Sequence, residues 1–261
     1  MVNIKPSQVE LWKQGRPSTK AIILSLLRDA KGKVLSGEAI AQAAQVSRVA
    51  VWKGIEGLKH AGYPIESIEN EGYRLDARWE DDFLYPWEFP GWEDRFFYYK
   101  SIDTTMNRAR QLAQGGSPGG AVIVAECQTG AVARQGGSWD SGLGGLYITL
   151  LERPLCPLSD YQRYIRHAWH CLGKTLEKEL GPVLQYDRYP DLYINDKKIA
   201  GIVSELHALD EQVKWISIGI GIHVNDQVKD GMSASCAAMA GRSLSRKALL
   251  RDFLSAWNRP T

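Results

Sequence analysis

Basic side chains near the N-terminus are spaced to contact nucleic acid. Arg48 and Lys53 follow Ser47, a good helix-capping residue, and stand five positions apart in a segment with helical periodicity. When such a helix enters the major groove of DNA, its first residues reach phosphates and base edges. Trp52 is open to two interpretations, because its ring could face the groove or cover the core of the module. The candidate DNA-binding residues are therefore Ser47, Arg48, Trp52 and Lys53.

Two segments that look like nucleotide-binding motifs do not meet the requirements of those motifs. Residues 173–175 (Gly-Lys-Thr) resemble the end of a phosphate-binding loop, but Ala168 stands where the loop needs a glycine, and the segment lies within a predicted helix. Gly219 and Gly221 fall inside a predicted strand, whereas a dinucleotide-binding fingerprint opens a helix. Neither segment therefore predicts nucleotide binding.

Three helical patterns and a hairpin position the candidate DNA-binding residues. The link around Gln45 and Val46 is short enough for a helix-turn-helix. The expected elements are a helix capped by Ser18 or Thr19, helices over 37–44 and from 48 to about 60, and wing strands at 63–65 and 73–75. A winged helix that contacts only proteins is the alternative. Glu56, Glu69 and Glu71 favour this alternative, because acidic side chains repel phosphate.

The composition excludes several classes of protein. The chain has 261 residues, 44% hydrophobic and 24% charged, which is typical of a globular protein long enough for two domains. Its 4 cysteines form no CxxC pair, which argues against a zinc cluster or a disulfide framework, so we expect no structural metal site. We find no signal peptide and no apolar run near the ~20 residues that span a bilayer. A cytoplasmic protein that does not bind membranes is therefore expected.

The charge is distributed unevenly along the chain. Residues 1–75 contain 11 Lys and Arg against 7 Asp and Glu, whereas the remainder contains 21 against 23. This asymmetry is typical of a small basic module joined to a larger, nearly neutral one. Residues 76–95 are acidic and rich in Trp and Pro, which predicts a linker packed onto a surface. The expected division is a winged-helix DNA-binding domain at 1–75, a linker at 76–95 and a ligand-binding domain at 96–261.

The larger domain alternates short apolar strands with two long helices. Strands are expected at 121–126, 146–151, 192–195, 199–206 and 215–222, and helices at 159–180 and from 245 to about 257. The predicted fold class is α+β, a mostly antiparallel mixed sheet with helices on one face, preceded by the winged helix-turn-helix.

Both parts of the chain resemble one family, the bifunctional biotin protein ligases that also act as biotin operon repressors. Residues 46–53, with 62–63 and 71–75, are similar to that family's recognition helix and wing. Further segments resemble the family's catalytic domain in the same order along the chain: 102–106, 126–130, 131–139, 188–191, 198–202 and 218–225. The resemblance implies a biotin-protein-ligase-like mixed-sheet domain after the winged helix.

The resemblance also implies a pocket for biotin or a related small molecule. The ligand-binding residues that it implies are Thr104, Thr105, Gln128, Arg134, Lys198 and Gly201. If the chain is an active ligase, Lys198, Arg134 and Asp191 are the implied catalytic residues, and Trp139 is the candidate for stacking on adenine. Each of these residues also has a structural alternative. For example, Thr104 and Thr105 could simply cap a helix, and Lys198 could be solvated after a hairpin turn.

The family's reaction joins biotin to ATP with Mg²⁺, forms biotinyl-AMP, and passes the biotinyl group to a lysine of a biotin carboxyl carrier protein. The implied partners are therefore a double-stranded DNA operator, a second copy of the chain in a homodimer, and a carrier protein if the chain is active.

The sequence departs from the family where the family handles phosphate. Cations must neutralise the carboxylate and the triphosphate as charge shifts in the transition state. Val132 and Gln135 replace arginines of the family's Gly/Arg loop, so Arg134 is its remaining cation. Losing one such cation typically costs about 2–4 kcal/mol of transition-state stabilisation. Met106 and His223 also replace asparagines, and the chain ends where the family continues into a small β-barrel.

Three interpretations remain open. The first is a transcriptional regulator whose ligase-like domain senses biotin or a related molecule with weak or no ligase activity. The second is an active bifunctional ligase and repressor that works through biotinyl-AMP. The third is a ligase-fold protein for another acyl group, because Met106 makes the pocket less polar than a ureido ring requires. The missing cations favour the first interpretation.

Overall fold

The computed structural model describes residues 17–134 and 136–258, and it divides into two compact units with a boundary between Asp94 and Arg95. Gln135, one of the replaced loop residues, lies outside the described residues, as do 1–16 and 259–261. Within the described ranges, no helix combines the length and apolar character needed to cross a bilayer.

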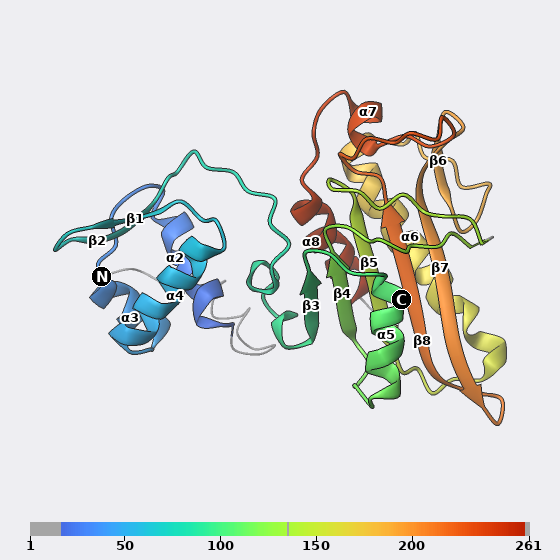
Figure 1. Ribbon diagram of the computed structural model, residues 1–261, viewed down its shortest axis with the longest axis horizontal. Helices are drawn as coiled ribbons and strands as arrows, with labels where there is room; N and C mark the ends of the chain where they lie inside the picture. Colours follow the sequence, from blue (N-terminus) through green and yellow to red (C-terminus); the bar gives the residue numbers. More distant parts are fainter. Residues whose placement is uncertain (1–16, 135, 259–261) are drawn as a thin grey trace. The chain divides into compact units, whose positions relative to one another are not determined.

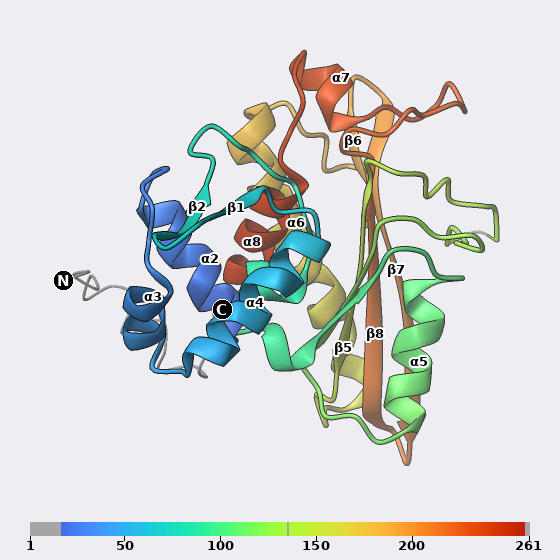
Figure 2. The same cartoon turned by 60° about the vertical axis from the view of Figure 1, so that its left-hand side comes forward.

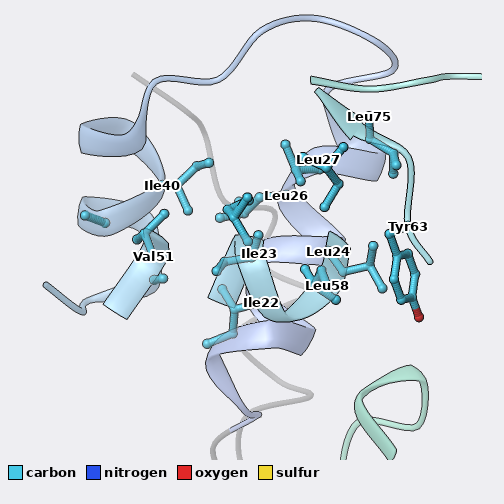
Figure 3. Packing of buried hydrophobic residues seen from close by; sticks show 14 residues of the cluster. Ile22, Ile23, Leu24, Leu26, Leu27, Ile40, Val51, Leu58, Tyr63 and Leu75 are labelled. Atoms are coloured by element: carbon cyan, nitrogen blue, oxygen red, sulfur yellow. The ribbon is translucent and has the colours of Figure 1, made fainter. Parts of the chain in front are cut away.

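Three helices form the core of the N-terminal unit (Figure 1). They are α2 (Thr19–Asp29), α3 (Gly37–Ala44) and α4 (Arg48–His60), each preceded by a serine whose hydroxyl oxygen accepts a backbone N–H of the first turn. Side chains from all three helices, including Ile23, Ile40, Val51 and Leu58, meet in one buried cluster (Figure 3). The predicted helix-turn-helix is confirmed, and Ser18 rather than Thr19 caps its first helix.

The wing is a hairpin of β1 (Ile65–Ile68) and β2 (Gly72–Leu75), in which Ile65 pairs with Leu75. The sequence analysis expected the first strand at 63–65, whereas the structure has it at Ile65–Ile68. Ile68 pairs with Gly72, so the turn contains only residues 69–71. Gly72 has a φ of 142°, and a Cβ there would collide with the carbonyl oxygen of Leu35. This close approach lets Leu35 pair with Tyr73 and ties the wing to the helices.

Residues 76–94 belong to the N-terminal unit. Arg28 of α2 donates hydrogen bonds to Asp81 at 2.7 Å and to Glu88 at 2.8 and 2.9 Å. The buried hydroxyl of Tyr63 donates to Glu88 at 2.5 Å. Four aromatic side chains of the segment also pack against the helical core: Trp79, Phe83, Tyr85 and Trp87. The predicted linker is thus packed onto a surface, as expected, and it clusters with the helices in a unit that ends at Asp94.

A six-stranded sheet organises the C-terminal unit. In spatial order its strands are β3 (Phe96–Tyr99), β4 (Ala121–Ala125), β5 (Leu146–Glu152), β8 (Gln212–Ile222), β7 (Lys197–Leu209) and β6 (Leu192–Ile194). β3 and β4 pair in parallel, and every other pair is antiparallel. The predicted mixed sheet is confirmed, with β3 as an edge strand that the sequence analysis did not include.

Helices cover both faces of this sheet, so the prediction of helices on one face was wrong. Every residue of β4 is buried, and successive strand residues point to opposite faces, so neither face can be open to water. α5 (Thr105–Gln114) lies on one side, and α6 (Gln162–Leu180) and α8 (Arg246–Trp257) lie on the other (Figure 2). The short α7 (Cys236–Ala240) follows β8. α5 was foreseen only as the helix that Thr104 and Thr105 could cap and was not among the expected long helices, because it packs through small residues, Ala109 and Ala113.

One end of the sheet gathers the segments that resemble the ligase family. β4 ends, β5 begins, β8 ends and β7 begins at this end, as the pairing of Leu146 and Ala200 with Ile222 requires. The N-terminus of α5 reaches the same end through Thr105 and Gln128. Residues far apart in the sequence are therefore neighbours here.

Candidate functional site

A cavity of about 560 Å³ opens at this end of the sheet. Its volume lies within the range of pockets that bind small molecules. Every residue predicted for ligand binding, catalysis or adenine stacking lines it: Thr104, Thr105, Gln128, Arg134, Trp139, Asp191, Lys198 and Gly201. The fold thus brings all of these side chains together around one space.

Thr105 and Gln128 form the polar end of the cavity. The Thr105 backbone N–H and hydroxyl donate to Oε1 of Gln128 at 2.8 and 3.1 Å, and Nε2 of Gln128 donates to Ser141 at 3.1 Å. The buried hydroxyl of Thr149 donates to Thr105 at 2.8 Å. Because a backbone N–H can only donate, this network fixes which way the Gln128 amide points. One N–H of that amide remains for a ligand acceptor.

Thr104 has the capping role that was its structural alternative. Its hydroxyl oxygen accepts the backbone N–H of Asn107 at 2.8 Å and begins α5. A capping oxygen keeps its own O–H, so Thr104 can cap the helix and still donate to a ligand.

Two cations share one carboxylate at the charged end of the cavity. Nζ of Lys198 lies 2.9 Å from Oδ2 of Asp191, and Nη2 of Arg134 lies 3.5 Å from the same oxygen. Asp191 is buried, whereas 46% of the Arg134 side chain is exposed. A Cβ on Gly201 would lie 3.0 Å from Asp191 and 3.1 Å from the Lys198 ammonium. The glycine therefore leaves room for the ion pair to lie against the strand.

The glycines of β8 make the floor of the cavity. A Cβ at Gly219 would lie 2.8 Å from Sδ of Met106, and one at Gly221 would lie 2.7 Å from Nε1 of Trp139. Met106 and Trp139 therefore lie flat against β8. The sequence analysis rejected these two glycines as a dinucleotide-binding motif. Their spacing of two residues places both on one face of a strand, and this pattern could have identified the floor of the cavity.

Trp139 stacks on a buried imidazole. Its ring and that of His223 lie 4.7 Å apart at 17°, and Nδ1 of His223 is 2.5 Å from Oδ2 of Asp226. Nζ of Lys198 lies 4.9 Å from the centre of the indole. His223 therefore occupies one face of the Trp139 ring, and the Lys198 ammonium also lies over the ring.

Arg110 and Glu205 line the cavity but were missed in the sequence. The Arg110 guanidinium makes two hydrogen bonds of 2.7 Å to the Glu205 carboxylate, joining α5 to β7. Gly201, Val203 and Glu205 alternate along β7, so strand periodicity could have identified Glu205. Nothing in the sequence identified Arg110 as its partner.

In the N-terminal unit, the candidate DNA-binding residues lie on the outer face of α4. Ser47 caps the helix through its hydroxyl oxygen, which accepts from Ala50 at 3.2 Å. Arg48 and Lys53 are exposed, and Trp52 is 55% exposed. The ring of Trp52 therefore does not cover the module's core.

Comparisons with known proteins match both units. A model of the HTH domain matches residues 20–74, and the model of the biotin/lipoate A/B protein ligase family matches 98–223. The bifunctional ligase/repressor BirA of Bacillus subtilis (strain 168) is 30% identical over 252 residues, 92% of this chain and 77% of that protein. BirA of Escherichia coli (strain K12) is 28% identical over 206 residues, 75% of this chain and 61% of that protein.

Solved structures show the same fold in the larger unit. The biotin protein ligase from Aquifex aeolicus, in complex with biotin and ATP, has a TM-score of 0.53 at 24% identity and covers 62% of this chain and 68% of its own. The Leishmania major biotin protein ligase in complex with biotinyl-5-AMP has a TM-score of 0.53 at 19% identity, covering 62% and 73%.

A winged helix-turn-helix followed by a ligase-fold domain defines a class of proteins that unites a DNA-binding module with a small-molecule ligase domain. Within that class, the chain belongs to the bifunctional ligase/repressor family of the BirA proteins.

Proposed function

We propose that the chain is a DNA-binding transcriptional regulator whose larger domain binds biotin or a closely related small molecule, with ligase activity that is weak or lost. The family supports both halves of this proposal. The Aquifex and Leishmania complexes support biotin, biotinyl-AMP and ATP as ligands, with ATP as a substrate if the chain is active. Mg²⁺ enters the proposal through the family's reaction alone.

The observation that carries the proposal is the carboxylate shared by Lys198 and Arg134. Two positive charges and one negative charge leave a single net positive charge at this end of the cavity. The other cation of the lining, Arg110, is neutralised by Glu205. One net charge can hold the single carboxylate of a biotin-like ligand, but a triphosphate carries several negative charges. The charge of the cavity is therefore sufficient for binding a biotin-like carboxylate but less suited to its adenylation by ATP.

The loop over the cavity adds little further charge. Val132 lines the cavity with 59% of its surface exposed, at a position where the family has an arginine. Arg134 is the described cation of this loop. Each missing cation costs about 2–4 kcal/mol, on the order of 30- to 1000-fold in rate.

The acidic side chains do not fit a metal site of the protein's own. Among the described residues, Asp191 and Glu205 are the acids that line the cavity, and both are paired with cations. The same part of the chain contains no group of three or more His, Cys, Asp or Glu that could hold a metal ion.

The partners follow from the two units. The exposed basic face of α4 supports a double-stranded DNA operator as the binding partner. Helix-turn-helix proteins that bind operators as dimers place one recognition helix on each half-site, and a homodimer of this chain would do the same. A location in the cytoplasm, with the DNA, completes the proposal.

An active ligase and repressor is the second candidate. The observation that favours it is the presence of Thr104, Thr105, Gln128 and Lys198 around a single cavity. In that case the biotin carboxyl carrier protein is a further partner, and Lys198, Arg134 and Asp191 act on the adenylate.

Native mass spectrometry separates the two candidates. Purified protein is incubated with biotin, ATP and Mg²⁺, and the bound species are weighed. Bound biotin without adenylate supports the regulator, whereas biotinyl-AMP at ordinary turnover contradicts it. Absence of bound biotin would favour a different acyl ligand.

Substitution of Arg48 tests the DNA-binding half. Arg48→Ala should weaken binding to a selected duplex by about 1–3 kcal/mol in an electrophoretic mobility assay, because the cation contacts phosphate or a base edge. Lys33→Ala, an exposed lysine outside α4, is the matched control. Equal affinities for both variants would contradict the assignment of α4 to the groove.

A further inference from the structure

Two large apolar side chains stand on the outer face of α4. Val49 is 62% exposed and Trp52 is 55% exposed. Within the described part of the N-terminal unit, they are the large hydrophobic side chains that remain exposed, while Val51, Ile55 and Leu58 of the same helix are buried in the core. Their exposure therefore has no explanation in the packing of the module.

Helix geometry puts the two side chains side by side. Residues three positions apart lie on one helix face, so Val49 and Trp52 form a continuous apolar strip in the first turns of α4. Arg48 borders the strip on one side and Lys53 on the other, and both are exposed. An apolar strip between two cations is complementary to the major groove, where phosphates line both walls and base edges form the floor.

The base edges of the major groove offer one type of apolar group, the C5 methyl of thymine. We propose that Val49 and Trp52 read thymine methyl groups, and that the DNA partner is a duplex with thymines at the positions facing this strip. This inference rests on the proposed function as a DNA-binding regulator and names the feature of the DNA that α4 selects.

The acidic neighbours of the strip are compatible with this assignment. Glu38 of α3 lies 3.7 Å from Arg48, a distance at which a surface ion pair contributes little and can be exchanged for phosphate. Glu56, four positions after Trp52, lies on the same helix face just beyond the strip. Its carboxylate is paired with Lys59 at 3.2 Å, which offsets its repulsion of phosphate.

The test removes single methyl groups from DNA. The full chain first selects duplexes from a random-sequence pool. In the best duplex, each thymine of the half-site is then replaced by deoxyuridine, which lacks only the methyl group. Affinities of the wild type and of Val49→Ala, Trp52→Ala and Leu209→Ala are measured by fluorescence anisotropy. Leu209 is an exposed leucine of the C-terminal unit and serves as the control.

We expect deoxyuridine at one or two positions to weaken wild-type binding about three- to fivefold, the effect of losing one buried methyl group. Trp52→Ala and Val49→Ala should each become insensitive to one such replacement, whereas Leu209→Ala should behave as the wild type. Equal wild-type affinities for thymine and deoxyuridine duplexes would overturn the inference and leave DNA binding intact. A changed oligomeric state of Trp52→Ala with unchanged thymine preference would overturn it too, in favour of a protein contact. Failure to select any duplex would contradict DNA binding itself.

Discussion

Charge in the pocket depends on a few single side chains. Lys198 and Arg134 converge on Asp191, and Arg110 is bound to Glu205, so the pairs cancel most of the charge of the lining. Position 132 is where one residue could change this balance, because its side chain lines the cavity and is exposed. The effect of the missing cations can therefore be measured by restoring one.

Val132→Arg should increase biotinyl-AMP formation on the order of tenfold, because one cation near the phosphates recovers part of the lost transition-state stabilisation. The measurement is pyrophosphate release with biotin and ATP. Val183→Arg adds the same charge at an exposed valine outside the cavity and should change nothing. If both variants match the wild type, charge at the loop is not what limits the reaction.

At the scale of elements, β8 and the loop of residues 131–139 must approach each other closely. The glycine at 221 leaves room for the Trp139 ring against the strand, and the ring in turn covers the buried His223. The side of the cavity near Lys198 therefore depends on a contact between a strand and a loop.

Gly221→Ala should weaken biotin binding at least tenfold, because the added Cβ would lie 2.7 Å from Nε1 of Trp139 and displace the ring into the cavity. Isothermal titration calorimetry measures the affinity. Gly137→Ala in the same loop is the control, since a Cβ there meets nothing within 4 Å. Unchanged affinity in Gly221→Ala would show that ligand binding does not depend on the position of Trp139.

The contact between α8 and β5 gives a pH-dependent prediction. Burial raises the pKa of Glu152, which accepts a hydrogen bond from Trp257 at 3.3 Å. The folded state therefore binds this proton more tightly than the unfolded chain does. The resulting stability is present at low pH and is lost as the pH rises through the folded pKa.

Glu152→Gln keeps an acceptor for Trp257 and removes the buried charge. Its free energy of unfolding should exceed that of the wild type at neutral pH, and the two should converge below the ordinary carboxyl pKa of about 4.3. Urea denaturation at a series of pH values measures the difference. Glu211→Gln, in an exposed turn, should follow the wild type throughout. A Glu152→Gln variant that is less stable at neutral pH would contradict the prediction.

Periodicity and capping predicted where α3 and α4 begin and closely where they end, because Ser36 and Ser47 cap them and each helix is short and amphipathic. The same rules left α5 as no more than a helix that Thr104 and Thr105 could cap, because its contact face is alanine, and they missed that it covers the second face of the sheet. Every candidate pocket residue came from family resemblance, and the fold brings them together. The Arg110–Glu205 pair joins a helix to a strand distant in sequence, so local patterns contain no information about it.

At the scale of the whole molecule, the proposal requires that the two units communicate. If biotin changes the affinity for DNA by some factor, thermodynamic linkage requires DNA to change the affinity for biotin by the same factor. Couplings of this kind are typically about 5- to 150-fold.

Saturating biotin should therefore shift the dissociation constant of a selected duplex by a factor in that range, measured by fluorescence anisotropy. Calorimetric titration of biotin with and without the duplex should give the same factor. If the dissociation constant of the duplex is the same with and without biotin, biotin is not an effector of DNA binding, even if both ligands bind.

The contacts of Arg28 and Tyr63 with residues 76–94 have a practical consequence for truncation. A recombinant fragment stopped at Leu75 would lose Asp81 and Glu88, the carboxylates that hydrogen-bond to Arg28 and Tyr63. The apolar surface that this segment covers would become exposed, and exposed apolar surface promotes aggregation. A fragment that ends at Asp94 keeps the acidic, Trp-rich segment packed on the helical core. Asp94 is therefore the end point to choose when the N-terminal unit is expressed alone.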